Sequence, residues 1–323
     1  MITTQDELQI PALGLWLDAR RPRDLSFISH AHSDHVGSHA RAIVTHETAE
    51  LCRERFSSKA DVDYEVHDLG ETFSVGDATC ELLSAGHILG SSQLFLNHDG
   101  QSLLYTGDFK LRSGRTHPRC ETRKCDILVM ECTYGRPRYR FPDRAAVESE
   151  LIARCAAALE QGKTPVVYAY ALGKAQEIIA ALNRAGLALQ LHAIIARICE
   201  AYERLGIDLG PWKRYERGTT HGHVLIVPPD ARRTPMIQGL FPRFDIAVTG
   251  WAIDAGTKFR MGVDLALPYS DHADFPELME YVERTEPGRV YCTHGFPDFV
   301  HYLRREGVNA SWLSATEQLE LFR

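Results

Sequence analysis

The feature that most constrains this chain is a run of donor side chains in the stretch SFISHAHSDHVGSHA, residues 26–40. It begins with an apolar segment typical of a strand and then places His30, His32, Asp34 and His35 within six residues. Alternate side chains of an extended loop point the same way, so positions 30, 32 and 34 share a direction and His35 points elsewhere. Imidazole and carboxylate are donors that suit Zn²⁺ or Mn²⁺. The stretch therefore predicts a loop that gives ligands to two cations.

Further donors stand at the ends of other apolar segments. They are His87 in LLSAGHILGSS, Asp108 in LLYTGDFK and His294 in YCTHGF. Two cations need about three or four ligands each, so these side chains would complete two sites. A carboxylate can bridge two cations through its two oxygens, which an imidazole cannot, and Asp108 is therefore the predicted bridging ligand. Each of the three alone would be explained as easily by a structural role.

Bulk properties fit a globular enzyme. The 323 residues are 44% hydrophobic and 24% charged, which is enough for a sizeable core in one large domain or two smaller ones. No apolar run of membrane-spanning length occurs, and the first residues lack the pattern of a secretory signal. The eight cysteines follow no disulfide framework and are expected to be reduced thiols. We therefore expect a cytoplasmic protein without a membrane partner.

The positive charge of the chain gathers in one segment. Residues 110–144 hold ten Lys or Arg against four Asp or Glu, a balance of +6 in a chain of net charge −7. Tyr134, Tyr139 and Phe141 lie among these cations. A solvated basic loop is one interpretation. The other is a surface that contacts a phosphate backbone through Arg136, Arg138 and Arg140 and stacks its aromatic side chains on bases.

The order of predicted elements indicates an insertion. Short strands separated by turns fill about the first 130 residues, and strands then alternate with helices, which is typical of a parallel α/β unit. Strands with histidines at their ends return after about residue 255. The prediction is a metal-bearing domain in two parts, 1–145 and 256–323, interrupted by a domain over 146–255.

Seven short motifs together resemble one known family: HAHSDH, GHILGSS, YTGDF, ECTYG, YALGKAQE, SDHAD and THG. They resemble the β-CASP nuclease branch of the metallo-β-lactamase superfamily, which contains RNase J, the pre-mRNA 3′-end processing endonuclease and the Artemis-type DNA repair nucleases. The short insertion looks most like bacterial DNA-ligase-associated exonucleases. The resemblance covers nearly the whole chain. It implies the α/β fold of that superfamily, an αββα sandwich, with an inserted small parallel α/β β-CASP domain.

The resemblance also implies roles for individual residues. Two divalent metal ions, Zn or Mn, would share seven ligands: His30, His32 and His87 on the first, Asp34, His35 and His294 on the second, and Asp108 between them. Four residues would act in catalysis or position those that do: Asp34, Asp108, Glu131 as an orienting carboxylate and His272 as the general acid. Asp18, which ends a strand, would steady the histidine loop. In this chain Cys132 stands where the family often has serine.

Another group of residues is predicted to bind substrate phosphate. In ALGKAQE, Gly173 permits a turn before a helix that starts at about Lys174, and free backbone N–H groups at a helix start can hold a phosphate. Thr249 and Ser270 follow predicted strands and would bind a terminal phosphate. The alternative is that Gly173 and Lys174 only begin an amphipathic helix.

These features favour a two-metal phosphodiesterase that acts as a DNA exonuclease in DNA repair or end processing. The alternatives are an RNA-processing endo- or exoribonuclease of the same fold, a small-molecule thioester or lactam hydrolase, and a scaffold without activity. His294 favours RNA, because DNA-cleaving relatives of the Artemis type usually lack this histidine. Likeness to the ligase-associated group favours DNA, and it implies a DNA ligase and a helicase as partners.

Overall fold

The computed structural model describes residues 3–4, 7–56 and 62–313, and it divides into two compact units. The first unit comprises residues 1–139 and 272–323, and the second comprises residues 140–271. The insertion is thus longer than the range 146–255 predicted from the sequence. It extends past residue 255 because β17 (Leu265–Leu267) pairs in parallel with β16 (Arg243–Val248) and completes the sheet of the second unit.

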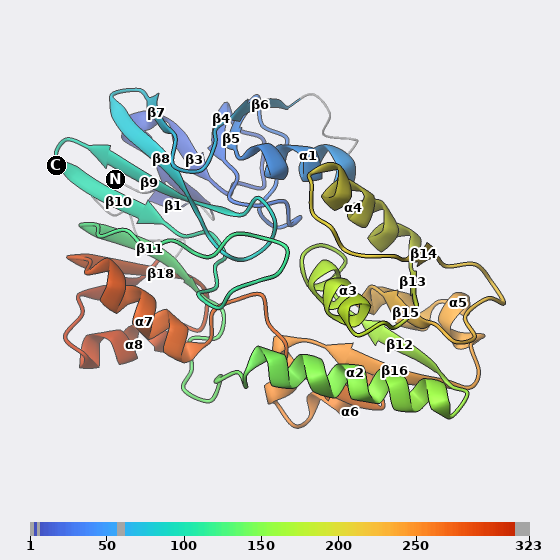
Figure 1. Ribbon diagram of the computed structural model, residues 1–323. Helices are drawn as coiled ribbons and strands as arrows, with labels where there is room; N and C mark the ends of the chain where they lie inside the picture. Colours follow the sequence, from blue (N-terminus) through green and yellow to red (C-terminus); the bar gives the residue numbers. More distant parts are fainter. Residues whose placement is uncertain (1–2, 5–6, 57–61, 314–323) are drawn as a thin grey trace. The chain divides into compact units, whose positions relative to one another are not determined.

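The first unit is built on two sheets (Figure 1). The first sheet has the order β1-β2-β3-β4-β5-β6, with bounds β1 Thr3–Thr4, β2 Leu8–Ile10, β3 Leu15–Leu17, β4 Leu25–Phe27, β5 Arg41–Val44 and β6 Asp63–Val66. The second has the order β19-β18-β11-β10-β9-β8-β7, with bounds β7 Thr72–Val75, β8 Ala78–Ser84, β9 Ser92–His98, β10 Gln101–Tyr105, β11 Ile127–Cys132, β18 Arg289–Gly295 and β19 Ala310–Trp312. A 3₁₀ turn, Pro11–Leu13, joins β2 to β3.

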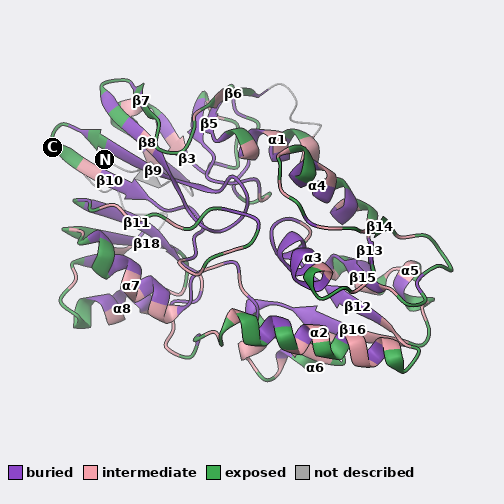
Figure 2. Cartoon of the chain, in the orientation of Figure 1, coloured by how far each residue is buried: buried purple, intermediate pink, exposed green. Residues whose placement is uncertain are grey.

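The alternation of side chains along the strands forms two cores in this unit. In β9, Leu94 and Leu96 pack into a cluster between the two sheets, and Phe95 packs into a second cluster on the opposite face. That second cluster contains residues of α7 (Phe275–Thr285) and α8 (Asp298–Arg305), which cover the outer face of the second sheet. The strand β11 is buried on both faces, as its continuous apolar sequence predicts (Figure 2).

Helices and sheets together give the expected αββα arrangement. The helix α1 (His46–Arg55) makes the crossover between β5 and β6, which pair in parallel, and it begins at Thr45, whose hydroxyl accepts a hydrogen bond from the Thr48 N–H. The two sheets therefore lie between α1 on one side and the pair α7 and α8 on the other.

The second unit is a parallel α/β sheet of order β14-β13-β15-β12-β16-β17. The strands besides β16 and β17 are β12 Thr164–Tyr168, β13 Leu189–Leu191, β14 Lys213–Arg214 and β15 Val224–Val227. The helices are α2 Arg144–Glu160, α3 Lys174–Arg184, α4 Ala193–Arg204, α5 Pro235–Gln238 and α6 Thr257–Met261, with 3₁₀ turns at Pro229–Arg233 and Gly250–Ile253. This is the parallel unit predicted from the alternation of strands and helices.

None of the helices in the described ranges has both the length and the apolar composition needed to cross a lipid bilayer.

The core between the two sheets gives a prediction for stability. Leu94 is fully buried there, so Leu94→Ala should lower the free energy of unfolding by about 2–5 kcal/mol. Leu69→Ala makes the same chemical change at a residue that is 37% exposed and should cost clearly less. Chemical denaturation of both variants measures the difference, and equal losses would contradict the assignment of the core.

Candidate metal centre

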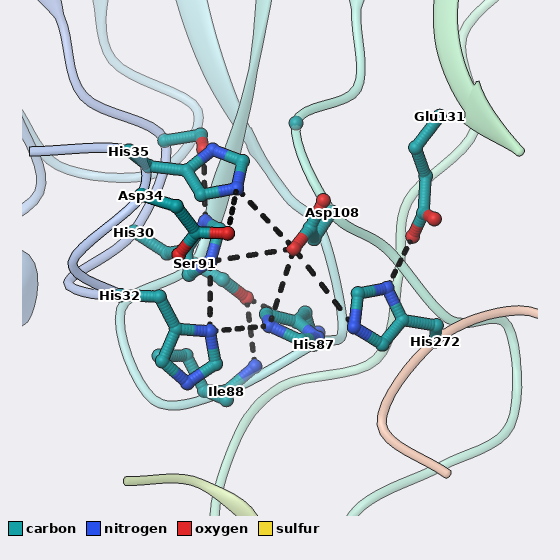
Figure 3. Close-up of polar contacts among 12 residues, drawn as sticks. His30, His32, Asp34, His35, His87, Ile88, Ser91, Asp108, Glu131 and His272 are labelled. Atoms are coloured by element: carbon teal, nitrogen blue, oxygen red, sulfur yellow. Dashed lines mark hydrogen bonds and ion pairs between the residues drawn. The ribbon is translucent and has the colours of Figure 1, made fainter. Parts of the chain in front are cut away.

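Six of the seven predicted ligands lie close together in the first unit, namely His30, His32, Asp34, His35, His87 and Asp108 (Figure 3). His30, His32, Asp34 and His35 lie in the loop after β4, and His87 follows β8. The remaining groups come from the second sheet and its loops: Asp108 after β10, Glu131 within β11, His272 before α7 and His294 within β18.

Three imidazoles and one carboxylate form the first ligand group. One ligand atom from each of His30, His32, His87 and Asp108 lies within 4.8 Å of the others. The Nε2 atom of His30 is 3.0 Å from Nδ1 of His32, and Nε2 of His87 is 3.2 Å from that same atom. His30 and His87 are buried. Buried nitrogens that converge in this way fit a cation held among them, and all four donors are types that bind Zn²⁺.

Asp108 connects this group to the other predicted ligands. Its Oδ2 atom is 3.6 Å from His30 Nε2 and 3.9 Å from His87 Nε2, and it is 3.4 Å from Nε2 of His35. The same nitrogen of His35 is 3.8 Å from Oδ2 of Asp34. One carboxylate therefore lies between the two predicted ligand groups, as a bridging ligand must.

His294, the remaining predicted ligand, lies near His35. Its ring centroid lies 5.8 Å from that of His35. Its φ of 47° is unusual for a residue other than glycine, and the following residue, Gly295, has a φ of 151°. A Cβ at Gly295 would lie 2.0 Å from the carbonyl oxygen of Cys132, so only glycine lets β18 end this close to β11.

A buried carboxylate, Asp18, orients the histidine loop. Its Oδ1 accepts a hydrogen bond from the Ser29 N–H at 2.6 Å. Its Oδ2 lies 2.7 Å from Ser29 Oγ, 2.8 Å from the Tyr105 hydroxyl and 2.9 Å from Nδ1 of His35. With Nδ1 of His35 engaged in this way, its Nε2 is left to face Asp108. A carboxylate behind a histidine ligand fixes the ring and raises its basicity.

Ser29 and Tyr105 were not among the predicted site residues. Ser29 lies directly before His30, and its Oγ is 2.9 Å from His30 Nδ1. Tyr105 appeared only as part of an apolar segment, although a buried tyrosine hydroxyl needs a polar partner, and that requirement is a signal in the sequence. The close approach of Ser29 also restricts position 107 to glycine. A Cβ on Gly107 would lie 2.5 Å from Cβ of Ser29.

Glu131 and His272 form a pair beside Asp108. Nδ1 of His272 lies 2.9 Å from Oε1 of Glu131, and its Nε2 is 3.9 Å from Oδ2 of Asp108. The Glu131 carboxylate also accepts hydrogen bonds from the N–H groups of Phe109 and Thr133. This buried carboxylate is thus fixed by the backbone and directs the imidazole toward the centre.

The local electrostatics depend on this crowding. Burial raises the pKa of Asp108, but the nearby His35 and His272 outweigh it and hold that pKa well below its ordinary value. Burial and the neighbouring histidines lower the pKa of His30 well below its ordinary value, which keeps the ring neutral. Burial also lowers the pKa of His35, but the carboxylates of Asp108 and Asp18 dominate and raise it. The ionised Asp108 carboxylate and the neutral His30 ring are ready to bind a cation, whereas the raised pKa favours the protonated ring of His35, which must lose that proton when a cation binds.

The start of α3 differs from the predicted phosphate site. Lys174 is buried, and its Nζ forms an ion pair with Asp271 at 2.8 Å. The N–H of Gly173 donates to Oε1 of Gln176, and the N–H of Ala175 donates to the Tyr170 carbonyl oxygen. Gly173 does adopt the predicted turn, with a φ of 86°. The ammonium of Lys174 and these two N–H groups thus have partners inside the unit, and phosphate binding by Gly173 and Lys174 stays a prediction.

The other predicted phosphate ligands are Thr249 and Ser270. Thr249 lies at the carboxyl edge of the same sheet, and Ser270 lies shortly before residue 272, where the first unit resumes. The Thr249 hydroxyl accepts a hydrogen bond from the Trp251 N–H at 3.4 Å, and Thr249 is buried. Ser270 is half-buried in the segment after β17. Thr249 therefore supports the turn that carries Trp251.

Several cations of the basic segment, residues 110–144, are paired with acidic side chains of the protein, which the interpretation as a phosphate surface did not include. Five of its cations form ion pairs with acids: Arg112 with Asp274, Arg123 with Glu81, Lys124 with Glu286, Arg136 with Asp298 and Arg144 with Glu148. Tyr134 and Tyr139 are buried, so their rings do not offer the stacking surface that the sequence suggested. Arg138 and Arg140 are exposed.

Comparisons with known proteins identify relatives of this chain. The family model of the Zn-dependent metallo-hydrolase RNA specificity domain matches residues 259–312. Over 317 residues the chain is 39% identical to a protein of Opitutus terrae named Probable DNA ligase, a match that covers 97% of this chain and 31% of that protein. It is 30% identical over 182 residues to the RNase J-like protein of Methanocaldococcus jannaschii, covering 50% of this chain and 43% of that protein. The chain thus spans less than half the length of each of these two relatives.

A solved structure resembles the fold. A crystal structure of a protein of unknown function from Enterococcus faecalis V583 matches with a TM-score of 0.59 and 16% sequence identity, covering 84% of this chain and 75% of that chain. At this identity the likeness concerns the fold alone.

The Asp18 network gives a prediction for metal affinity. Asp18→Asn keeps the shape but removes the charge behind His35, and it should weaken metal binding by roughly 10- to 100-fold. Tyr105→Phe removes one hydrogen bond and keeps the carboxylate, so its loss should be smaller. Titration of chelated protein with Zn²⁺ measures both affinities. Unchanged affinity in Asp18→Asn would show that this carboxylate does not support the ligands.

Proposed function

The chain belongs to the β-CASP branch of the metallo-β-lactamase superfamily, and from this premise we propose that it is a two-metal phosphodiesterase that cleaves a nucleic-acid backbone. One observation supports this most strongly. The buried Asp108 carboxylate lies within 3.9 Å of imidazole nitrogens from both predicted ligand groups. We propose that His30, His32 and His87 hold one cation, that Asp34, His35 and His294 hold the other, and that Asp108 bridges them.

When bound, a pair of divalent cations neutralises phosphate oxygens and lowers the pKa of an attacking water. The ligands of this chain would add only two negative charges, from Asp34 and Asp108, to the four positive charges of such a pair. The occupied centre therefore keeps a net positive charge, which suits an anionic phosphodiester.

We propose that His272 is the general acid that donates a proton to the leaving oxygen. Glu131 holds its Nδ1, so Nε2 faces the centre at the position where Asp108 lies. An imidazole titrates near neutral pH and serves there as a general acid. The alternative is that His272 is a further metal ligand. One ligand atom from each of Asp108, Glu131 and His272 lies within 4.8 Å of the others, which supports this alternative. Metal analysis of the variant described below separates the two roles.

For the substrate we propose DNA, cleaved as an exonuclease in repair or end processing. The match to the protein named Probable DNA ligase covers nearly this whole chain, whereas the match to the RNase J-like protein covers half of it. The former also supports a DNA ligase as partner, and the helicase stays a prediction. RNA is the second candidate. It is favoured by the family model, whose description names RNA specificity and whose range includes His272 and His294.

The assignment of His272 predicts a specific kinetic defect. His272→Ala should lower turnover by about 10²- to 10⁴-fold while the bound metal stays at two ions per chain. His301→Ala replaces an exposed histidine on α8 and should leave both unchanged. Single-turnover assays and elemental analysis measure the two quantities. Loss of metal in His272→Ala would make this residue a ligand instead.

The substrate proposal predicts a cleavage pattern. Metal-loaded protein incubated with end-labelled single-stranded and duplex DNA and RNA should shorten DNA from one end in steps, and chelator should stop the reaction. Asp108→Asn provides the matched inactive control, because it keeps the size of the bridging residue and removes its charge. Preferential cleavage of RNA, or internal cuts only, would contradict the exonuclease on DNA.

A further inference from the structure

The second unit contains a cavity of about 350 Å³ that the metal centre does not explain. Its walls come from residues that follow three neighbouring strands and from α6. Tyr170 follows β12, Pro229 follows β15, and Thr249 and Trp251 follow β16, while Arg260 belongs to α6. The volume is at the lower end of the range for ligand pockets, roughly 300–1,000 Å³.

The topology of the sheet explains why a cavity forms at this place. The strands β12 and β16 are parallel neighbours. The connection after β12 leads through α3 to β13, on the β14 side of the sheet, and the connection after β16 leads through α6 to β17, on the opposite side. Two loops that leave adjacent strands in opposite directions open a crevice at the carboxyl edge, where parallel α/β sheets bind ligands.

Aromatic side chains are displayed at this crevice. Tyr170 is 54% exposed and Trp251 is 36% exposed, although both are large rings that a folded chain usually buries. The Thr249 hydroxyl holds the turn at Trp251, and the Lys174 ammonium lies 4.8 Å from the centroid of the Tyr170 ring. Both rings are therefore supported in their exposed positions.

Positive charge lies beside these rings. Arg260 lines the cavity, and Lys258, also on α6, is exposed. One guanidinium N–H of Arg260 donates to the Thr257 hydroxyl, and the same nitrogen is 3.9 Å from an Asp254 oxygen, which orients the group at the cavity. Flat aromatic surfaces next to cations match a chain of bases joined by phosphates.

We propose that this cavity binds one base of a single-stranded nucleic acid, stacked on Trp251 and Tyr170, with Arg260 contacting a neighbouring phosphate. The choice of ligand rests on the proposed function, and the site itself rests on the cavity, the exposed rings and the cations. Stacking does not depend on base identity, so the site gives affinity for single strands without sequence preference.

The test compares strands with and without bases. Full-length protein in chelator, which prevents cleavage, is titrated into a fluorescently labelled single-stranded DNA and into an all-abasic strand of equal length, and anisotropy reports binding. Wild type should bind the base-bearing strand more tightly. Trp251→Leu should weaken that binding by roughly 10- to 100-fold and leave binding to the abasic strand unchanged.

Two further variants control for the fold and for the ring. Trp251→Phe keeps an aromatic face and should restore most of the affinity. Trp212→Leu removes a half-buried tryptophan that lines a different cavity of the same unit and should have no effect on binding. Equal affinity of wild type and Trp251→Leu for the base-bearing strand, or equal losses on both strands, would overturn the proposal.

The outcome is separable from that of the proposed function. If the protein cleaves nucleic acid but Trp251→Leu binds as wild type does, the base site is wrong and the nuclease stands. If no strand is cleaved under any metal condition while binding still depends on Trp251 and on bases, the base site stands and the nuclease is wrong.

Discussion

The first unit depends on one electrostatic arrangement, a buried carboxylate surrounded by imidazoles. Asp108 has nitrogens of His30, His35, His87 and His272 between 3.4 and 3.9 Å from one of its oxygens. A buried charge is costly unless it is paired or coordinates a metal, and the buried histidines keep this carboxylate ionised. Burying these groups together costs free energy of folding without a structural benefit, but the same arrangement suits the binding of divalent cations.

The strands explain how residues so distant in the chain reach one place. Predicted ligands follow β4 in the first sheet and β8 and β10 in the second, and the two sheets share a core of leucines such as Leu94 and Leu96. Side chains behind the ligands then fix their orientation. Asp18 acts on His35 and on the loop through Ser29, and Glu131 acts on His272. Packing sets the position of the loops, and hydrogen bonds set the direction of each ring.

Local spacing made it predictable from the sequence that His30, His32, His87 and Asp108 gather in one place. Four donors within six residues after an apolar strand have few structural explanations, and His87 and Asp108 stand beside glycines at strand ends. The αββα fold came from the motif resemblance, while the parallel insertion followed from the alternation of strands and helices. The boundary of the insertion did not follow from that alternation. Residues 256–271 contain β17, which belongs to the second unit through its pairing with β16, and this pairing leaves no local pattern in the sequence.

Charge was a poorer guide, since sequence alone does not show which cations have partners. A phosphate surface was one of two interpretations of the basic segment, yet Arg112 and Arg136 are paired with Asp274 and Asp298. Lys174 likewise pairs with Asp271, nearly a hundred positions away. Such pairs form between segments far apart in the chain and leave no local pattern. The cavity at Trp251 was missed for the same reason, because its walls come from separate loops.

The most direct test of the two-ion centre is anomalous diffraction from crystals soaked in Mn²⁺. The account predicts two anomalous peaks on either side of the Asp108 carboxylate, one among His30, His32 and His87 and one among Asp34, His35 and His294. A single peak at full occupancy after saturating soaks, or peaks away from Asp108, would contradict it.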